Sequence, residues 1–163
     1  MIQNLKQPPS AALVRAVENI PPGEALDLAC GAGRHAIYLA GKGWRVTAVD
    51  SSSAALARLS EQASGLNIAV QRLDLEKQEF DIRPGAYDLI VTWLYLQRDL
   101  FPHIRSGVRL GGLAAAAALM HGRFAAQPGE LVHAFEGWDI LHYEENADVS
   151  EIVAQKKTAS ERL

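Results

Sequence analysis

Apolar positions recur along the chain with two different periods, which alternate from about residue 10 to about residue 110. Runs rich in apolar and β-branched residues, with turn residues at their ends, predict strands over 25–29, 44–49, 67–73 and 87–93. Apolar residues at helical spacing predict helices over 33–40 and 55–63. This alternation predicts an α/β fold with one doubly wound, mainly parallel sheet and helices on both faces.

Both ends of the chain carry further elements. Ser10 can cap a helix with Leu13 and Val17 on its apolar side, which should end before Pro21. Towards the C-terminus we expect a helix and then a hairpin of two antiparallel strands with its turn at Asn146, over 127–135, 137–145 and 149–157. No internal repeat or linker interrupts the pattern, so we expect a single domain over residues 1–163.

The segment before these C-terminal elements contains conflicting signals. A predicted helix over 100–108 and the pair Gly111-Gly112 precede 113-LAAAAALM-120, whose five consecutive alanines favour helix by intrinsic propensity. A strand buried between two layers of helices can nevertheless use small side chains, and the alternation requires a strand here. We therefore predict that 113–120 is the fifth strand and that the two glycines form the turn before it.

The stretch 27-DLACGAGRHA-36 lies between the first strand and the helix that follows it. Gly31 and Gly33 permit a tight turn and a close approach of a ligand to the backbone, at the sheet edge where open α/β sheets bind ligands. Asp50 stands 19 residues after Gly31, at the end of the second strand, and could accept hydrogen bonds from both hydroxyls of a ribose. The glycine pattern alone is common by chance, and the acid at the end of the second strand strengthens the prediction of a ligand site.

Asp27 separates two classes of ligand that share this geometry. A dinucleotide would place its pyrophosphate at the glycine turn, where the carboxylate would oppose it and N–H groups at a helix terminus would be needed. S-adenosylmethionine has no phosphate there and brings a sulfonium and an ammonium group, which a carboxylate stabilises directly or through water. Asp27 therefore favours the sulfonium cofactor.

These residues resemble the class I S-adenosylmethionine-dependent methyltransferases, over nearly the whole chain. The segments that carry the resemblance are DLACGAGR, VTAVDSS, RLDLE and YDLIVTWLYLQRDLFPHI. Within that class, PGELVHAFEGWDILHYEE and LQRDLFP are similar to small bacterial proteins related to the tellurite-resistance methyltransferases. The resemblance implies a Rossmann-like fold and an enzyme that uses S-adenosyl-L-methionine.

The resemblance also implies where each part of the cofactor would lie. The methionine part would lie at the glycine-rich turn, the ribose at Asp50, the adenine at Asp74, and the sulfonium beside the end of the fourth strand. The expected cofactor-binding residues are Asp27, Ala29, Gly31, Gly33, Arg34, Asp50, Ser51, Asp74, Leu75, Thr92 and Trp93. Simpler roles stay open: Asp27 could bond local backbone, Asp50 could cap the next helix, and Asp74 could belong to an acidic surface loop.

The acceptor of the methyl group is less well defined. Tyr95, Gln97, His121 and Arg123 are polar candidates by position, but none is identified as a catalytic base. Transfer to a thiol or chalcogen anion needs orientation and charge balance more than a base. The segment TWLYLQ lacks the Asn/Asp-Pro-Pro-aromatic motif of the amino-group methyltransferases that act on DNA and some proteins, which favours a small-molecule acceptor.

Composition and charge narrow the possible partners and the location. The formal net charge is -3 and no basic run exceeds Lys156-Lys157, which disfavours nucleic acid and anionic membranes. No apolar run approaches the roughly 20 residues of a membrane span, and the N-terminus lacks a signal-peptide pattern, so we expect a cytoplasmic protein. Cys30 is the only cysteine and the histidine spacings form no recognisable metal site, so no metal is expected.

Two alternatives to a methyltransferase stay open: a protein that binds the cofactor with little or no catalysis, and a nicotinamide-dinucleotide-binding protein. The short segment HGRFAAQ after the fifth strand should leave the methyl-facing side of the site open to water. A closing element would then be needed. We expect the N-terminal segment 1–20 to act as a lid, with Leu5, Leu13 and Val14 as its apolar residues; a second copy of the chain in a homodimer is the other option.

Overall fold

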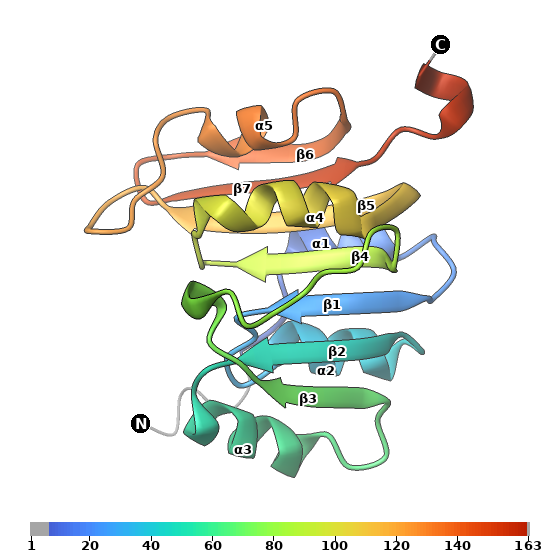
Figure 1. The fold of residues 1–163 in the computed structure, drawn as a ribbon, viewed down its shortest axis with the longest axis vertical. Coiled ribbons are helices and arrows are strands. Elements are labelled where there is room, and N and C mark those ends of the chain that lie inside the picture. The colour runs from blue at the N-terminus through green and yellow to red at the C-terminus, as the bar shows by residue number, and fades with distance from the viewer. Residues whose placement is uncertain (1–6, 163) are drawn as a thin grey trace.

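One sheet of seven strands in the order β3-β2-β1-β4-β5-β7-β6 runs through the computed structural model, which describes residues 7–162 (Figure 1). β1 to β5 are parallel, and β7 pairs antiparallel with both β5 and β6. The strands are β1 Glu24–Leu28, β2 Arg45–Asp50, β3 Ile68–Arg72, β4 Tyr87–Trp93, β5 Val108–Leu119, β6 Asp139–Glu145 and β7 Val149–Gln155. The predicted mainly parallel sheet with a C-terminal antiparallel hairpin is confirmed.

Helices cover both faces of the sheet, as predicted, with α1 and α2 behind it and α4 in front of it in Figure 1. The α-helices are α1 Ala11–Val17, α2 Arg34–Gly41, α3 Ser53–Gln62, α4 Phe101–Gly107 and α5 Glu130–Ala134, and the 3-10 helices are η2 Leu75–Lys77, η3 Arg98–Leu100 and η4 Ala159–Arg162. Alternate strand residues point to opposite faces. Leu113 and Ala115 therefore join the core under α1 to α3, while Ala114 and Ala116 join the core under α4 and α5.

The alanine run is a strand, as predicted. Its residues pair with β4 on one side and with β7 on the other, and each of Ala114–Ala118 is no more than 1% exposed. A central strand between two layers of helices gains hydrogen bonds on both sides, and the small side chains let the helices approach. This pairing outweighs the helical preference of alanine.

The predicted turn at Gly111-Gly112 is wrong, because β5 begins directly after α4 and contains both glycines. Gly111 has φ 81°, and the register between β4 and β5 shifts at this place. A Cβ on Gly112 would lie 2.8 Å from the carbonyl oxygen of Asp88. The glycines thus form an irregularity within the strand, where neighbouring backbone approaches closely.

The predicted helix over 127–135 is shorter than expected. α5 starts only after Gly129, which has φ 74°, so residues 127–129 form the approach to the helix rather than its first turn. The Glu130 side chain instead accepts the backbone N–H of Gln127 at 2.7 Å. The turn at Asn146 is confirmed, since its side-chain oxygen accepts the N–H groups of Asp148 and Val149 at 2.8 and 3.0 Å.

The N-terminal helix is part of the core. The Ser10 side chain caps α1 by accepting the N–H of Leu13, and Leu13 and Val17 are buried against the sheet. Leu5, which we expected in a lid, lies outside the described residues. Within residues 7–162, no helix has the length and apolar character that a membrane crossing requires.

Candidate functional site

The turn between β1 and α2 is held in left-handed backbone conformations. Ala29, Gly31 and Gly33 have φ of 54°, 58° and 84°, and this region is costly for a residue with a side chain. A Cβ on Gly33 would collide with Leu59 of α3, whereas a Cβ on Gly31 would meet nothing within 4 Å. The two glycines therefore differ in role: Gly33 permits close packing of α2, and Gly31 leaves the backbone open to a ligand.

Asp50 connects the end of β2 to this turn. One carboxylate oxygen accepts the N–H of Gly31 at 2.9 Å, and the other accepts the N–H of Ser52 at 2.8 Å. The cap of α3 is Ser52, whose hydroxyl accepts the N–H of Ala55 at 3.2 Å, so Asp50 is not the helix cap. Each carboxylate oxygen has a further lone pair, so Asp50 can accept two more hydrogen bonds.

A cavity of about 340 Å³ opens beside Asp50 at the carboxyl edge of the sheet. Its lining combines the turn after β1 with the segments that follow β2, β3 and β4. The lining residues are Ala29, Asp50, Ser51, Leu73, Asp74, Leu75, Glu76 and Tyr95. The structure therefore brings together five of the predicted cofactor-binding residues, namely Ala29, Asp50, Ser51, Asp74 and Leu75. It adds Tyr95, which was expected on the acceptor side, and Leu73 and Glu76, which were not predicted.

Asp74 has a structural role as well as a place in this cavity. It caps η2, since one side-chain oxygen accepts the N–H of Glu76 at 3.0 Å. Its own N–H donates to the Glu79 carboxylate at 3.0 Å, which fixes the loop. Leu75 follows as a buried apolar wall. Asp74 thus bonds local backbone, as expected for an acid in a surface loop, and also lines the cavity, as expected for a cofactor-binding residue.

Asp27 lies beneath the turn and is only 2% exposed. Burial raises its pKa from the ordinary 3.8 to about 7, although the N–H of Ala36 and the charge of Arg34 act in the opposite direction. Its Oδ2 atom has no hydrogen-bond partner among the described residues. A buried acceptor without a donor costs on the order of 1–3 kcal/mol, so this atom calls for a donor that residues 7–162 do not supply.

The remaining predicted cofactor-binding residues are not among those that line the cavity. Thr92 is buried, and its hydroxyl donates to the carbonyl oxygen of Tyr95 at 3.2 Å. The Trp93 ring contacts the His35 ring edge-on, with 5.4 Å between the ring centroids. Arg34 donates to the carbonyl oxygen of Pro8 at 3.2 Å. Arg34 thus contacts the N-terminal segment, whereas Thr92 contacts the segment after β4.

His35 is a site-adjacent residue that the sequence reasoning missed. Its Nε2 atom accepts the N–H of Ser10 at 3.1 Å, and burial lowers its pKa to about 4, so the ring is neutral and can accept. Together with Arg34, it holds residues 8–10 at the start of α2. A histidine directly after the glycine-rich turn was visible in the sequence, but its partner was not.

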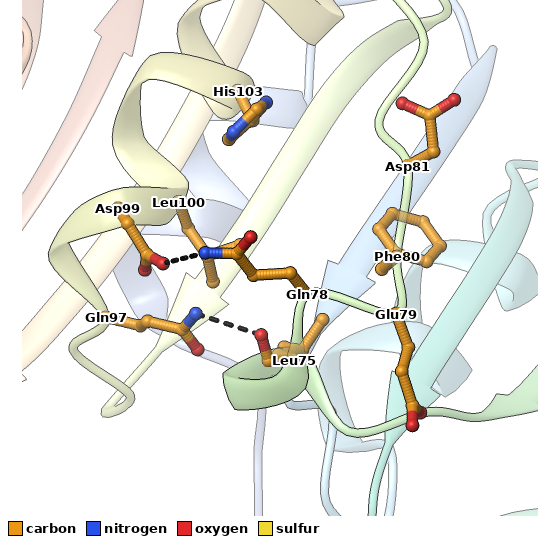
Figure 2. A pocket seen from close by; sticks show the side chains of 9 residues that line it. All are labelled: Leu75, Gln78, Glu79, Phe80, Asp81, Gln97, Asp99, Leu100 and His103. Atoms are coloured by element: carbon orange, nitrogen blue, oxygen red, sulfur yellow. Dashed lines mark hydrogen bonds between the residues drawn. The ribbon is translucent and has the colours of Figure 1, made fainter.

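A second cavity, of about 290 Å³, has Leu75 in common with the first and is shown in Figure 2. It is lined by Leu75, Gln78, Glu79, Phe80, Asp81, Gln97, Asp99, Leu100 and His103. Two side-chain amides cross from one wall to the other: Gln97 donates to the Leu75 carbonyl oxygen at 3.0 Å, and Gln78 donates to Asp99 at 3.4 Å. The segments after β3 and β4 are therefore linked.

The candidates for the acceptor side are divided between two places. Tyr95 lines the first cavity, and Gln97 is bonded to it, so both belong to the side on which the adenine was expected. His121 and Arg123 are exposed in the loop after β5; His121 lies 3.7 Å from Asp148, and Arg123 lies over the Phe124 ring. Neither of these two lines a described cavity.

The β6–β7 hairpin carries a group of potential metal ligands that sequence spacing did not reveal. Ligand atoms of His142, Glu144 and Glu151 lie within 4.8 Å of one another, and His142 already bonds Glu151 at 2.8 Å. The strand register creates this group, because Glu144 pairs with Glu151 across the hairpin. This group of potential ligands contains none of the residues that line the cavity beside Asp50. That the protein requires no metal stays a prediction from the sequence.

The fold defines a class: a Rossmann-like sheet with the S-adenosylmethionine-dependent methyltransferase architecture. The crystal structure of TehB from Haemophilus influenzae has this fold, with a TM-score of 0.81 and 25% identity, over 91% of this chain and 62% of that chain. The family described as tellurite resistance protein TehB matches residues 4–160, and the chain belongs to this family.

Two relatives extend the comparison. The chain is 31% identical over 155 residues to hemagglutinin 1 of Eikenella corrodens, covering 83% of this chain and 50% of that protein. It is 29% identical over 152 residues to the probable S-adenosyl-L-methionine-dependent methyltransferase TehB of Haemophilus influenzae, covering 82% of this chain and 52% of that protein. The chain thus spans about half the length of the curated relatives that it matches.

Proposed function

We propose that the protein binds S-adenosyl-L-methionine and transfers its methyl group to a small molecule. The observation that carries the proposal is Asp27, a buried carboxyl beneath the glycine-rich turn with one oxygen that has no donor. A cationic ligand group at this place would supply the donor and favour the ionised carboxylate. A pyrophosphate would instead add negative charge beside Asp27, which argues against a nicotinamide dinucleotide.

The other residues of the site fit the same cofactor. Asp50 has lone pairs available for ribose hydroxyls, and Gly31 leaves room for the approach of a ligand to the backbone. Leu75 offers an apolar wall for a purine, and Asp74 an acceptor. The cofactor would supply an electrophilic methyl group for attack by a lone pair of the acceptor. The protein would orient the reactants and exclude water.

For the acceptor we propose a small thiol or chalcogen anion. The description of the family, tellurite resistance, supports a chalcogen compound, and the net charge of -3 does not favour nucleic acid. Asp50, Asp74 and Glu76 would repel an anion from the cavity beside Asp50. We therefore expect the acceptor to approach from the side of Trp93, past the start of α2.

A closing element for that side is part of the proposal. Residues 8–10 are tied to Arg34 and His35, and His35 in turn contacts Trp93. This arrangement supports the N-terminal segment as a cover for the acceptor side, although α1 itself belongs to the core. A homodimer and a cytoplasmic location stay predictions from the sequence.

Calorimetry with S-adenosylhomocysteine and NAD, measured side by side, tests the cofactor. We expect S-adenosylhomocysteine to bind and NAD not to bind; tight binding of NAD alone would refute the proposal. Transfer of labelled methyl from S-adenosylmethionine to thiols, selenide and tellurite, with RNA and protein as controls, then tests the acceptor. Cofactor binding without transfer to any of these would favour a binding protein with little or no catalysis.

A further inference from the structure

A chain of hydrogen bonds fixes the hydroxyl group of Tyr95, a residue that lines the cavity beside Asp50. The Tyr95 hydroxyl lies 2.6 Å from Oε1 of Gln97, and Nε2 of Gln97 lies 3.0 Å from the carbonyl oxygen of Leu75. Figure 2 shows the bond from Gln97 to Leu75. Tyr95 and Leu75 both line the cavity, so Gln97 joins two of its walls from behind.

The direction of each bond follows from donor and acceptor chemistry. A backbone carbonyl can only accept, so the amide nitrogen of Gln97 must face Leu75 and the amide oxygen must face Tyr95. That oxygen can only accept, so Tyr95 must donate its single hydroxyl hydrogen to Gln97. The Tyr95 oxygen is then left with lone pairs alone and can only accept from a third partner.

The surroundings keep this hydroxyl protonated. Burial raises the pKa of Tyr95, and the neighbouring carboxylates raise it further, namely Glu76, Asp74, Asp99 and Asp50. The backbone of Tyr95 is held as well, because its carbonyl oxygen accepts the hydroxyl of Thr92. Tyr95 therefore presents one neutral acceptor of fixed direction.

We propose that Tyr95, oriented by Gln97, accepts a hydrogen bond from the exocyclic amine of the adenine and makes the site selective for adenine over hypoxanthine. The proposal rests on the cofactor proposed above and adds a specificity determinant to it. The adenine amine is a donor, whereas the oxygen at the same position of hypoxanthine is an acceptor. An acceptor that cannot turn into a donor rejects the second base because the two oxygens would face each other unpaired.

The test compares S-adenosylhomocysteine with its deaminated form, S-inosylhomocysteine, by calorimetry on the full chain. We expect the unmodified protein to bind the adenosyl compound at least about 10-fold more tightly. Tyr95→Phe should lower the affinity for the adenosyl compound and reduce this ratio several-fold. Gln97→Met should reduce the ratio in another way, by releasing the Tyr95 hydrogen so that the hydroxyl can donate to the inosyl oxygen and improve its binding.

Gln78→Met is the matched control, because Gln78 makes its amide contact with Asp99 across the other cavity. It should leave the ratio unchanged. A ratio near one in the unmodified protein, or a ratio that Tyr95→Phe does not alter, overturns the role of Tyr95. Absence of binding for both compounds in the unmodified protein overturns the proposed cofactor itself, so the two failures are distinguishable.

Discussion

The carboxyl edge of the sheet has two unlike halves. Around β1 and β2, Asp27 is buried and Asp50 is fixed by two backbone N–H groups. After β5, the loop of residues 121–127 carries exposed side chains, and Phe124 is 68% exposed. The first half has a shape that is set before any ligand arrives. The second has few contacts that would hold a ligand group in place.

This contrast indicates which part of the proposed reaction the described residues prepare. Polar groups that are held by backbone and packing bind a ligand without a further loss of conformational entropy. The proposed cofactor side of the site has this property. The acceptor side would have to be completed by a segment that closes, by the acceptor itself, or by residues beyond those that the structure describes.

The largest effect is expected for Asp50→Ala in the ordered half. Hydrogen bonds to a charged acceptor contribute roughly 1.5 to 3 kcal/mol, so the affinity for S-adenosylhomocysteine should fall on the order of 10- to 100-fold. Calorimetry measures the loss, and a thermal melt checks that the fold survives. Asp148→Ala is the control in the open half, where the Asp148 side chain is 81% exposed; it should change neither quantity. Unchanged affinity with a collapsed fold would show that Asp50 serves the turn alone.

A smaller and pH-dependent effect is expected for Asp27→Asn. The carboxyl has a pKa of about 7, so the unmodified protein carries the charge that attracts an ammonium group only above about that pH. Asp27→Asn should weaken the binding of S-adenosylhomocysteine about 10-fold at pH 8, and much less at pH 5.5, where Asp27 is protonated. A deficit that is the same at both values would show that ionisation of Asp27 does not contribute to binding.

The same substitution should have the opposite effect on stability. Because the folded pKa is raised above the ordinary 3.8, the favourable contribution of the neutral carboxyl is complete below about pH 4 and is lost as the pH rises through about 7. Asp27→Asn should therefore raise the melting temperature of the protein without cofactor at pH 8 and change it little at pH 4. Denaturation at the two pH values measures this difference.

The smallest effect on cofactor binding is expected for removal of residues 1–9. Removal of residues 1–19 would also take away Leu13 and Val17, which are buried in the core. A loss of activity could then come from unfolding as well as from the loss of a covering segment. The shorter deletion keeps Ser10 and α1 but removes the Pro8 carbonyl that Arg34 bonds. Methyl transfer should fall several-fold while the affinity for S-adenosylhomocysteine changes by less than about twofold. Equal losses of methyl transfer and of affinity, or no loss of either, would exclude a selective role of residues 1–9 as a cover.

Much of the fold could be predicted because it depends on local rules. Ser10 caps α1, Gly31 and Gly33 take positive φ, and Asn146 makes the hairpin turn, each at the place where its residue type is favoured. The cavity residues that follow the strands could be predicted for a similar reason, since parallel strands bring their carboxyl ends to one edge. Asp50 and Asp74 line one cavity for this reason.

The order of the elements, the turn that opens the site and the acids at the strand ends could thus be predicted from the sequence, because they depend on backbone preferences and on period. The tertiary structure, by contrast, decided that Gly111 and Gly112 lie within β5 rather than in a turn before it, since this depends on pairing with β4 and β7. It also decided the partners of Tyr95 and Gln97, and the unpaired oxygen of Asp27. Hydrogen bonding and burial depend on groups far apart in the chain, and no local pattern records them.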